Sequence, residues 1–434
     1  MINQTSIHEI AFDPADAKAA LSQLPTAPAV FAMYGAEAHA EPYIGRTPNL
    51  RGRLERLLQP SEKHPRRLQL AGLVRQIRWR LTGSEFESLL LQFELLEKVY
   101  GTKCLERMHL GAPSFVRFLG GNAYPRITVT NRPSLREAAW SYGPFPSRAA
   151  AERFAEEALK LFLLRRCTEE LTPRPDHPGC VYSEMKMCLA PCYQGCTDER
   201  YAEEASAVER FLATRGESRL VQLRSERDTA SANLKFEDAA AVHAQVQRVE
   251  SVRTLASDLV RPLAELRAVI LQTSSIPGEV AVFLYENSRL SGPQSISSQG
   301  IILKGHDSSR ATNCAEEGRA LAFEESTQEN ALESAQSSVN TPAESESNAS
   351  VKLARAVLEA RMEAVLATLA TPAATSPTLR QGYLALLKRW YYRPEARRAG
   401  EIFFPDAEGR WPIKALLRGV GRVAGKMLAG GICD

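Results

Sequence analysis

The spacing of hydrophobic and polar residues predicts strands and helices in close succession over the first hundred positions. The stretch Ala29–Tyr34 is rich in β-branched and aromatic residues, and it can pair as a hairpin with a strand that carries Tyr43. The alternating stretch Ile77–Leu81 predicts another strand. Because helical patterns lie between and after these strands, this part of the chain is expected to fold as a small α+β domain.

Three helices are expected in the same region. A lead-in helix is predicted over Asp13–Leu24, and a second over about Asn49–Leu58. Ser84 can cap a third helix, Glu85–Tyr100, with Glu87 in the position of a capping box.

The later segments differ in character from one another. Residues 113–131 predict a hairpin, 148–166 a helix, 199–214 and 217–256 long helical stretches, 266–303 strands, and 351–434 a helical tail. Residues 306–350 have few aromatics, many Ser, Glu, Asn and Ala, and no period, so disorder is expected there.

These patterns divide the chain into seven segments. They are a lead-in (1–25), an α+β domain (26–110), a linker with a helix and a cysteine cluster (111–198), a helical region (199–257), a β-rich part (258–304), an acidic and serine-rich insert (305–350), and a basic helical tail (351–434).

Charge is distributed unevenly along the 434 residues, although the formal net charge is only +3. Residues 51–80 hold nine Lys and Arg against two acids, and residues 380–426 hold eleven against four. Between 306 and 350 the sign reverses, with nine acids against two arginines. This arrangement fits either a nucleic-acid binder with an acidic insert or ordinary solvated faces.

The sequence has no apolar run of about 18 residues and no signal-peptide pattern at its start, so no membrane partner and a cytoplasmic location are expected. In a reducing compartment, eight cysteines favour metal binding or free thiols over disulfides.

The segment Pro42–Arg46, followed by Arg53, carries the most specific chemistry. Tyr43 lies at a strand end, and its phenol can carry a proton. Gly45 lets the backbone come close to a ligand, while Arg46 and Arg53 can clamp phosphate oxygens. These residue types together suit a phosphodiester substrate.

Through Tyr43-Ile44-Gly45, Asn49-Leu50 and Arg53, this segment resembles the GIY-YIG nuclease domain, and its flanks resemble the amino-terminal half of the excision-repair nuclease subunit UvrC. The resemblance implies a small mixed sheet with helices, double-stranded DNA as partner, Tyr43 as general base or its relay, and Arg53 as the transition-state clamp. Arg46 stands where UvrC-like chains usually have lysine. Neighbouring basic residues are expected to bind DNA, namely Arg51, Arg56, Arg66 and Arg67.

Four positions depart from the family pattern: Phe31, Leu57, Gln92 and Cys104 stand where a tyrosine, a Tyr or His, a glutamate and an asparagine are usual. Gln92 matters most, because the family's glutamate binds the Mg²⁺ or Mn²⁺ ion and a neutral amide is a poor ligand for either. Glu94 would point to the other side of the helix, and Glu85 would share the face of Gln92 at roughly 10 Å.

Four cysteines lie within one short segment: Cys167, Cys180, Cys188 and Cys192. Their spacing suits zinc or an iron–sulfur cluster equally. They look like the UvrC cysteine segment, for which the resemblance implies a four-iron cluster; zinc and unligated thiols remain alternatives. Cys196 is a spare or an alternative ligand.

Residues 218–254 resemble the UVR motif shared by UvrC and UvrB, an α-helical hairpin. The resemblance implies a docking site for a UvrB-like protein, with four residues as partner contacts: Leu234, Phe236, Glu237 and Ala240. The alternative is a helical pair that packs only on its own chain.

The resemblance fades after the strands of 268–303, which look like the opening of the next UvrC half. Neither a convincing set of acids for an RNase H-like nuclease nor a tandem helix-hairpin-helix end is found. Leu416–Arg422 is either one such hairpin or a glycine-bearing helix end, and Trp390–Arg393 either stacks on bases or covers a core.

Two functions therefore compete. The first is a UvrC-like, metal-dependent endonuclease of nucleotide excision repair with a degenerate metal site. The second is a catalytically silent adaptor that binds DNA and a UvrB-like protein. A third hypothesis is a regulator that senses redox state through its cysteines.

Overall fold

The computed structural model describes residues 7–37, 40–58, 70–298, 342–370, 372–374 and 376–430. Arg66 and Arg67, residues 299–304 of the expected β-rich part and residues 305–341 of the expected insert lie outside the described residues. Helix α11 begins at Pro342, so the expectation of disorder is wrong for residues 342–350. Within the described part of the chain, no helix is long and apolar enough to cross a membrane.

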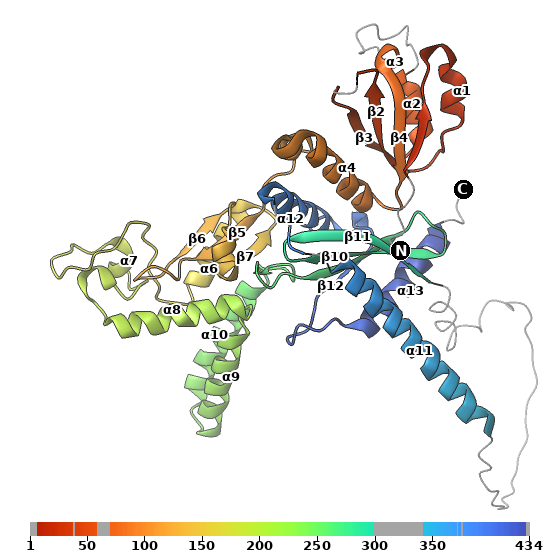
Figure 1. The fold of residues 1–434 in the computed structure, drawn as a ribbon. Helices are drawn as coiled ribbons and strands as arrows, with labels where there is room; N and C mark the ends of the chain where they lie inside the picture. Colours follow the sequence, from red (N-terminus) through yellow and green to blue (C-terminus); the bar gives the residue numbers. More distant parts are fainter. Residues whose placement is uncertain are drawn as a thin grey trace, which may run out of the picture.

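The amino-terminal domain is a four-stranded antiparallel sheet in the order β1-β4-β2-β3 (Figure 1). The predicted hairpin is confirmed, since Met33 pairs with Tyr43. Its strands are β1 (His8–Ala11), β2 (Ala29–Gly35), β3 (Tyr43–Thr47) and β4 (Val74–Leu81), and its helices are α1 (Ala17–Ser22), α2 (Leu50–Leu58) and α3 (Leu70–Leu73). Strand β1 was not predicted, and the lead-in helix is shorter than expected because Asp13 caps a short 3-10 helix before it.

Helix α4 (Glu85–Tyr100) has the predicted bounds and cap. Ser84 Oγ accepts from the Glu87 backbone N–H at 3.1 Å. The Glu87 carboxylate accepts from the Gly83 N–H at 2.8 Å, one residue earlier than in a standard capping box. This buried carboxylate thereby satisfies a backbone donor at the junction between β4 and α4.

A second sheet, in the order β11-β10-β9-β12, lies in the carboxy-terminal half. Its strands are β9 (Ala268–Thr273), β10 (Glu279–Glu286), β11 (Arg289–Ser297) and β12 (Glu401–Phe403), and its helices are α11 (Pro342–Leu369), α12 (Pro377–Tyr391) and α13 (Ile413–Gly430). Ala268 and Ile270 face α4 and α12, whereas Val269 and Leu271 face α11 and α13. Since both faces are covered, β9 and β10 read as continuous hydrophobic runs.

The middle part is a third sheet, in the order β6-β5-β7-β8, packed against helices. Its strands are β5 (Ser114–Phe118), β6 (Ile127–Thr130), β7 (Ser141–Phe145) and β8 (Arg261–Pro262), and its helices are α6 (Arg148–Leu159), α7 (Val181–Glu184), α8 (Asp198–Ala213), α9 (Glu217–Ala232) and α10 (Phe236–Arg253). The short helix α5 (Cys104–Arg107) follows α4 and belongs to the core that α4 shares with α12. The hairpin predicted in 113–131 is confirmed, while the helix predicted over 148–166 ends at Leu159.

The structure of the carboxy-terminal tail decides between the alternatives left open for Trp390–Arg393 and for Leu416–Arg422. Trp390 is 3% exposed in the core beside α4, so it covers a core. Helix α13 runs through 416–422 without a break, so neither a hairpin nor a helix end lies there. A Cβ on Gly419 would lie 2.6 Å from Phe403 Cζ, which indicates that this glycine serves close packing of α13 on β12.

Helix α4 also packs against the carboxy-terminal half, and a single glycine makes that contact close. A Cβ on Gly382 of α12 would lie 1.9 Å from Phe93 Cζ on α4. Gly382→Ala should therefore destabilise the protein by about 1–3 kcal/mol through overpacking, measured by thermal unfolding. Gly425→Ala, in an exposed turn of α13 with open space around it, is the matched control and should be neutral or stabilising. Equal effects of the two substitutions would contradict the packing argument.

Candidate active site

Tyr43 is presented at the edge of the amino-terminal sheet. It is the first residue of edge strand β3, and its side chain is 41% exposed. Its ring centroid lies 6.1 Å from that of the buried Phe31 on β2. A Cβ on Gly45 would come within 2.8 Å of Phe31 and 3.2 Å of Tyr43, so only glycine lets both rings occupy this face. The phenol is thus accessible and supported from behind by an apolar ring.

Polar contacts at the start of α2 fix the position of Arg53. The Thr47 hydroxyl accepts from the Asn49 N–H at 3.1 Å, and the Asn49 side-chain oxygen accepts from the Gly52 N–H at 2.9 Å. Among the described residues, the Arg53 guanidinium, on a partly buried side chain, has no hydrogen bond or ion pair. It is therefore free to bind an anion.

The two other arginines of α2 differ in their surroundings. Arg51 is partly buried, and its Nε donates to the Leu24 carbonyl at 2.6 Å, which ties α2 to the end of the lead-in region. Arg56 is exposed and donates only to the Gly52 carbonyl of its own helix, at 2.9 Å. Arg51 thus has a structural role in addition to any contact with DNA, whereas Arg56 lies fully at the surface.

Helix α4 carries Gln92, together with Glu94 two residues after it and Glu85 on the same helix face two turns before it. Gln92 is partly exposed, and its amide has no hydrogen bond to a described residue. Glu94 accepts a hydrogen bond from the Tyr383 hydroxyl at 3.1 Å, and burial raises its pKa. It is therefore held in the contact between α4 and α12, on the side that faces away from the candidate site, as helical geometry predicts.

Glu85 is held by two arginines. Arg393 binds it in a bidentate manner, with nitrogen–oxygen distances of 2.7 and 2.8 Å, and Arg46 Nη1 lies 3.3 Å from Oε1. The hydrogen bonds from Arg393 lower the pKa of Glu85 from 4.5 to about 2, against the opposing effect of its partial burial, and the charges of Arg393 and Arg46 add to the shift. We call Arg46, Glu85 and Arg393 the arginine clamp.

The arginine clamp should make a pH-dependent contribution to stability. Glu85→Gln should lower the free energy of unfolding by up to about 1 kcal/mol at pH 7, since the pair is partly exposed. A folded-state pKa of about 2, against 4.5 without the clamp, places the full contribution above about pH 4.5 and its loss between there and pH 2. Denaturant unfolding of both proteins from pH 7 to pH 2 measures the difference.

A matched control for this titration is Glu9→Gln, which removes the exposed pair with Arg78 at 2.9 Å. If wild type and Glu85→Gln had the same free energy of unfolding above pH 4.5, the result would contradict a stabilising clamp.

Sequence reasoning missed Arg393. It lies in the basic aromatic segment that was flagged as a base stacker or core cover, but no sequence spacing links it to Glu85, 308 residues away. In the structure it reaches α4 because α12 packs along that helix through Phe93 and Tyr383, whose ring centroids are 5.5 Å apart.

The carboxylates near Tyr43 do not gather into a metal site. Across the described ranges, no group of three or more His, Cys, Asp or Glu side chains is close enough to hold a metal ion. Of the two α4 acids considered as substitutes for the family's metal-binding glutamate at position 92, Glu85 lies in the arginine clamp and Glu94 accepts from Tyr383.

The four cysteines of the linker are free thiols, none of them in a disulfide. Burial raises the pKa of Cys188, and the charges of Cys180, Cys192 and Cys167 raise it further. Among the described residues, which include these cysteines, no group of three or more metal-binding side chains is close enough to hold a metal ion, so the described structure does not assemble the predicted ligand set. Burial and the charge of Asp198 raise the pKa of Cys196, and the charge of Arg200 lowers it. None of the four other cysteines is among these causes, which sets Cys196 apart from them.

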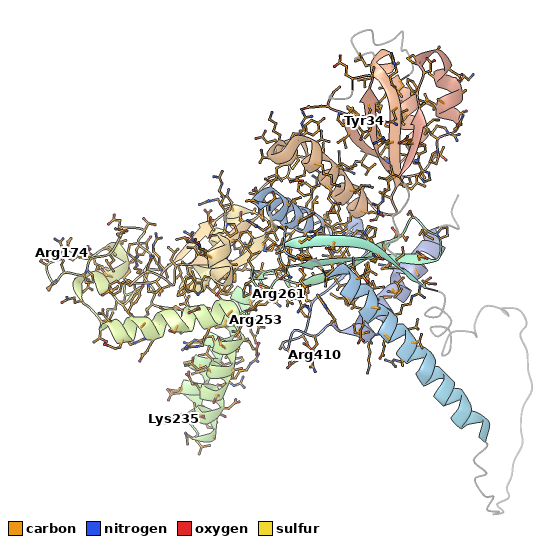
Figure 2. The ribbon with its side chains drawn as sticks, viewed as in Figure 1. Tyr34, Arg174, Lys235, Arg253, Arg261 and Arg410 are labelled. Carbon is orange, nitrogen blue, oxygen red and sulfur yellow. The ribbon has the colours of Figure 1, made fainter. Side chains whose placement is uncertain are left out.

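The helical hairpin α9–α10 has a buried base and an exposed tip. Leu220, Leu223 and Val246 are buried against the middle part of the chain. At the tip, Leu234 is 74% exposed and Phe236 is 65% exposed. The other two predicted partner contacts, Glu237 and Ala240, are exposed as well. The hairpin projects from the body, with Lys235 at its far end (Figure 2). The apolar side chains of the hairpin are thus divided between a buried base and an exposed tip.

Two stretches of the chain match known families. Residues 27–100 match the UvrC-like GIY-YIG domain, and residues 115–211 match the middle domain of the UvrC/Cho excinuclease. The chain is UvrC-like across these two consecutive domains. No solved structure matches it.

Two curated relatives of this chain are called UvrABC system protein C. UvrABC system protein C of Shigella dysenteriae serotype 1 (strain Sd197) is 31% identical over 243 residues, which is 55% of this chain and 41% of that protein. UvrABC system protein C of Escherichia coli (strain K12 / DH10B) is also 31% identical over 243 residues, 55% of this chain and 39% of that protein. The chain thus spans about two fifths of the length of these curated relatives.

Proposed function

We propose that this protein is a DNA-binding, UvrC-like component of nucleotide excision repair in the cytoplasm, in which the GIY-YIG scaffold is kept and strand cleavage is lost. The observation that carries the proposal is that two acids of α4 are held by other residues: Glu94, two positions after Gln92, and Glu85, which shares the helix face of Gln92. Glu85 is bound by Arg393 and Arg46, and Glu94 by Tyr383. Neither carboxylate is free to replace the family's metal ligand.

The chemistry of a GIY-YIG nuclease explains why this loss is severe. A bound Mg²⁺ or Mn²⁺ would supply charge stabilisation at the phosphate and a more acidic water. Tyr43 would take a proton from the nucleophile, and Arg53 would donate to the phosphate oxygens. Without a carboxylate at position 92 of α4, the protein can still bind the phosphodiester through Arg53 and exposed Arg56, but it lacks the anionic group that holds the ion in the family.

A second candidate function is a weak nuclease, favoured by the intact geometry around Tyr43. The phenol is exposed, Gly45 seats it against Phe31, and the Arg53 guanidinium has no partner among the described residues. In this case DNA phosphates or an acid from a partner would complete the site.

We further propose that the exposed tip of α9–α10 binds a UvrB-like protein and that the four linker cysteines hold a structural iron–sulfur cluster, or zinc in its place. Exposed Leu234 and Phe236 support the first, because an unpartnered apolar tip on a helical pair is suited to a groove on another protein. The close spacing of the four cysteines in the sequence supports the second.

The test uses the full-length protein, purified anaerobically, with a lesion-bearing duplex, a UvrB-like protein and Mn²⁺. We expect binding that weakens about 100-fold or more between about 50 and about 200 mM salt, and no nicking. Tyr43→Phe should leave binding unchanged. Metal-dependent nicking that disappears in Tyr43→Phe would overturn the silent-adaptor proposal in favour of the weak nuclease.

A further inference from the structure

A cavity of about 490 Å³ lies between the middle part and the carboxy-terminal half. Its inner wall includes three buried apolar side chains from three different elements or loops: Phe115 of β5, Leu263 after β8, and Leu384 of α12. This volume is within the range of about 300–1,000 Å³ typical of small-ligand sites. The wall can therefore accept the ring of a ligand out of water.

The rim of this cavity is positively charged. Arg132 and Arg136 come from the segment after β6, and Arg380 comes from the first turns of α12. Among the described residues, no carboxylate contributes to the lining. The acid next in sequence, Glu137, is paired with Arg117 at 3.0 Å, so it leaves Arg136 uncompensated. Three guanidiniums around an apolar wall favour an anionic ligand that also has an apolar part.

The backbone around the rim is shaped by short polar contacts. Thr130 Oγ1 accepts from the Arg132 N–H at 3.1 Å, and Ser134 Oγ accepts from the Arg136 N–H at 3.3 Å. On the opposite side, Arg380 Nη1 donates to the Ala374 carbonyl at 3.0 Å. These contacts hold the segment that carries Arg132 and Arg136 in a defined turn facing α12.

The lining also includes two amide side chains, Asn131 and Gln381. An amide carries both donors and acceptors, as do the edges of nucleobases. Arginines for phosphate, amides for base edges and an apolar wall for the base plane together match a nucleotide. A phosphorylated peptide would use the arginines but would leave the combination of wall and amides unexplained.

We propose that this cavity binds one unstacked nucleotide of a DNA strand, with the phosphate at Arg132, Arg136 and Arg380 and the base against the apolar wall. The proposal rests on the DNA-binding function proposed above. It adds a second contact point outside the amino-terminal domain, where a base that has left the duplex stack is held. A free mononucleotide has the same chemistry and is the other source of such a ligand.

The test compares wild type with Arg132→Gln/Arg136→Gln, two exposed residues whose loss leaves the core intact. Its control is Arg355→Gln/Arg361→Gln on α11, which removes the same charge at exposed positions. The probes are a duplex with 2-aminopurine opposite a mismatch, the fully paired duplex, and deoxyadenosine monophosphate. We expect wild type to raise 2-aminopurine fluorescence on the mismatched duplex and to bind it about tenfold more tightly than the paired one.

In the cavity variant both the fluorescence increase and the tenfold preference should be lost, whereas the control should keep both. An unchanged preference in the cavity variant overturns the nucleotide site and leaves DNA binding standing. Binding of deoxyadenosine monophosphate that the cavity variant loses, without any preference for the mismatched duplex, overturns the DNA strand as the source and assigns the cavity to free nucleotides. Absence of all DNA binding in wild type refutes the proposed function instead.

Discussion

Gln92→Glu is expected to convert a protein that binds DNA without cutting it into one that nicks DNA when Mn²⁺ is present. The substitution restores a carboxylate on the partly exposed face of α4, where Gln92 has no partner among the described residues. Tyr43 and Arg53 already have accessible side chains for proton transfer and phosphate binding. We expect nicking at least about 100-fold above wild type, the usual scale for one group that acts on transition-state charge.

The controls for this gain separate chemistry from binding. Gln92→Ala should remain silent, which excludes a mere steric effect of the amide. Tyr43→Phe added to Gln92→Glu should abolish nicking without changing DNA affinity. If Gln92→Glu binds DNA and Mn²⁺ but does not cut, the lost glutamate is not the sole defect. The departures at Phe31 and Leu57 and the commitment of Arg46 to Glu85 would then account for the silence.

The arginine clamp offers a physical reason why Gln92→Glu could bind DNA and Mn²⁺ without cutting. Arg46 stands where UvrC-like chains usually carry lysine, and a guanidinium can bind a carboxylate and a second group at once, which a compact ammonium does less well. In this structure Arg46 is 3.3 Å from Glu85, which Arg393 also binds. Part of the positive charge expected at a phosphate is thus directed at a carboxylate of the same chain.

Local pattern was sufficient to predict most of the amino-terminal domain. The β2–β3 hairpin, helix α2 and helix α4 with its Ser84 cap follow from periodicity and cap chemistry. Strands β1 and β12 were missed because they have four and three residues, too few for an alternating pattern to be recognised. Their pairing with β4 and β9 depends on distant partners, which local sequence does not specify.

The candidate site was predictable in its residues but not in its surroundings. Motif spacing identified Tyr43, Arg53 and Gln92, and helical geometry placed Glu94 on the far side of α4. The ion pair between Glu85 and Arg393 joins residues 308 positions apart and exists because α12 packs on α4. The cavity lined by Arg132 and Arg380 likewise forms only where two separate parts of the chain meet.

Leu234→Gly is expected to have opposite effects on stability and on partner binding. Leu234 has a positive φ of 60° at the end of α9, where the Lys235 N–H donates to the Ala230 carbonyl and the Leu234 N–H to the Ser231 carbonyl. This pattern is a Schellman motif, in which glycine is the usual residue because a side chain there costs about 1 kcal/mol. A strained leucine that is 74% exposed gains nothing from its own fold. Under the proposed docking role, contact with a UvrB-like partner would account for this leucine.

We expect Leu234→Gly to raise the free energy of unfolding by about 0.5–1 kcal/mol and to weaken binding of a UvrB-like protein by about tenfold or more. Phe236→Ala should weaken that binding without changing stability, since Phe236 is 65% exposed. His109→Gly, which relieves a positive φ of 51° outside the hairpin, should affect stability alone. Thermal unfolding and titration with the partner measure the two effects.

Unchanged partner affinity in Leu234→Gly and Phe236→Ala would remove the tip from the interface. The hairpin would then be an internal helical pair, because its base is already buried through Leu220, Leu223 and Val246.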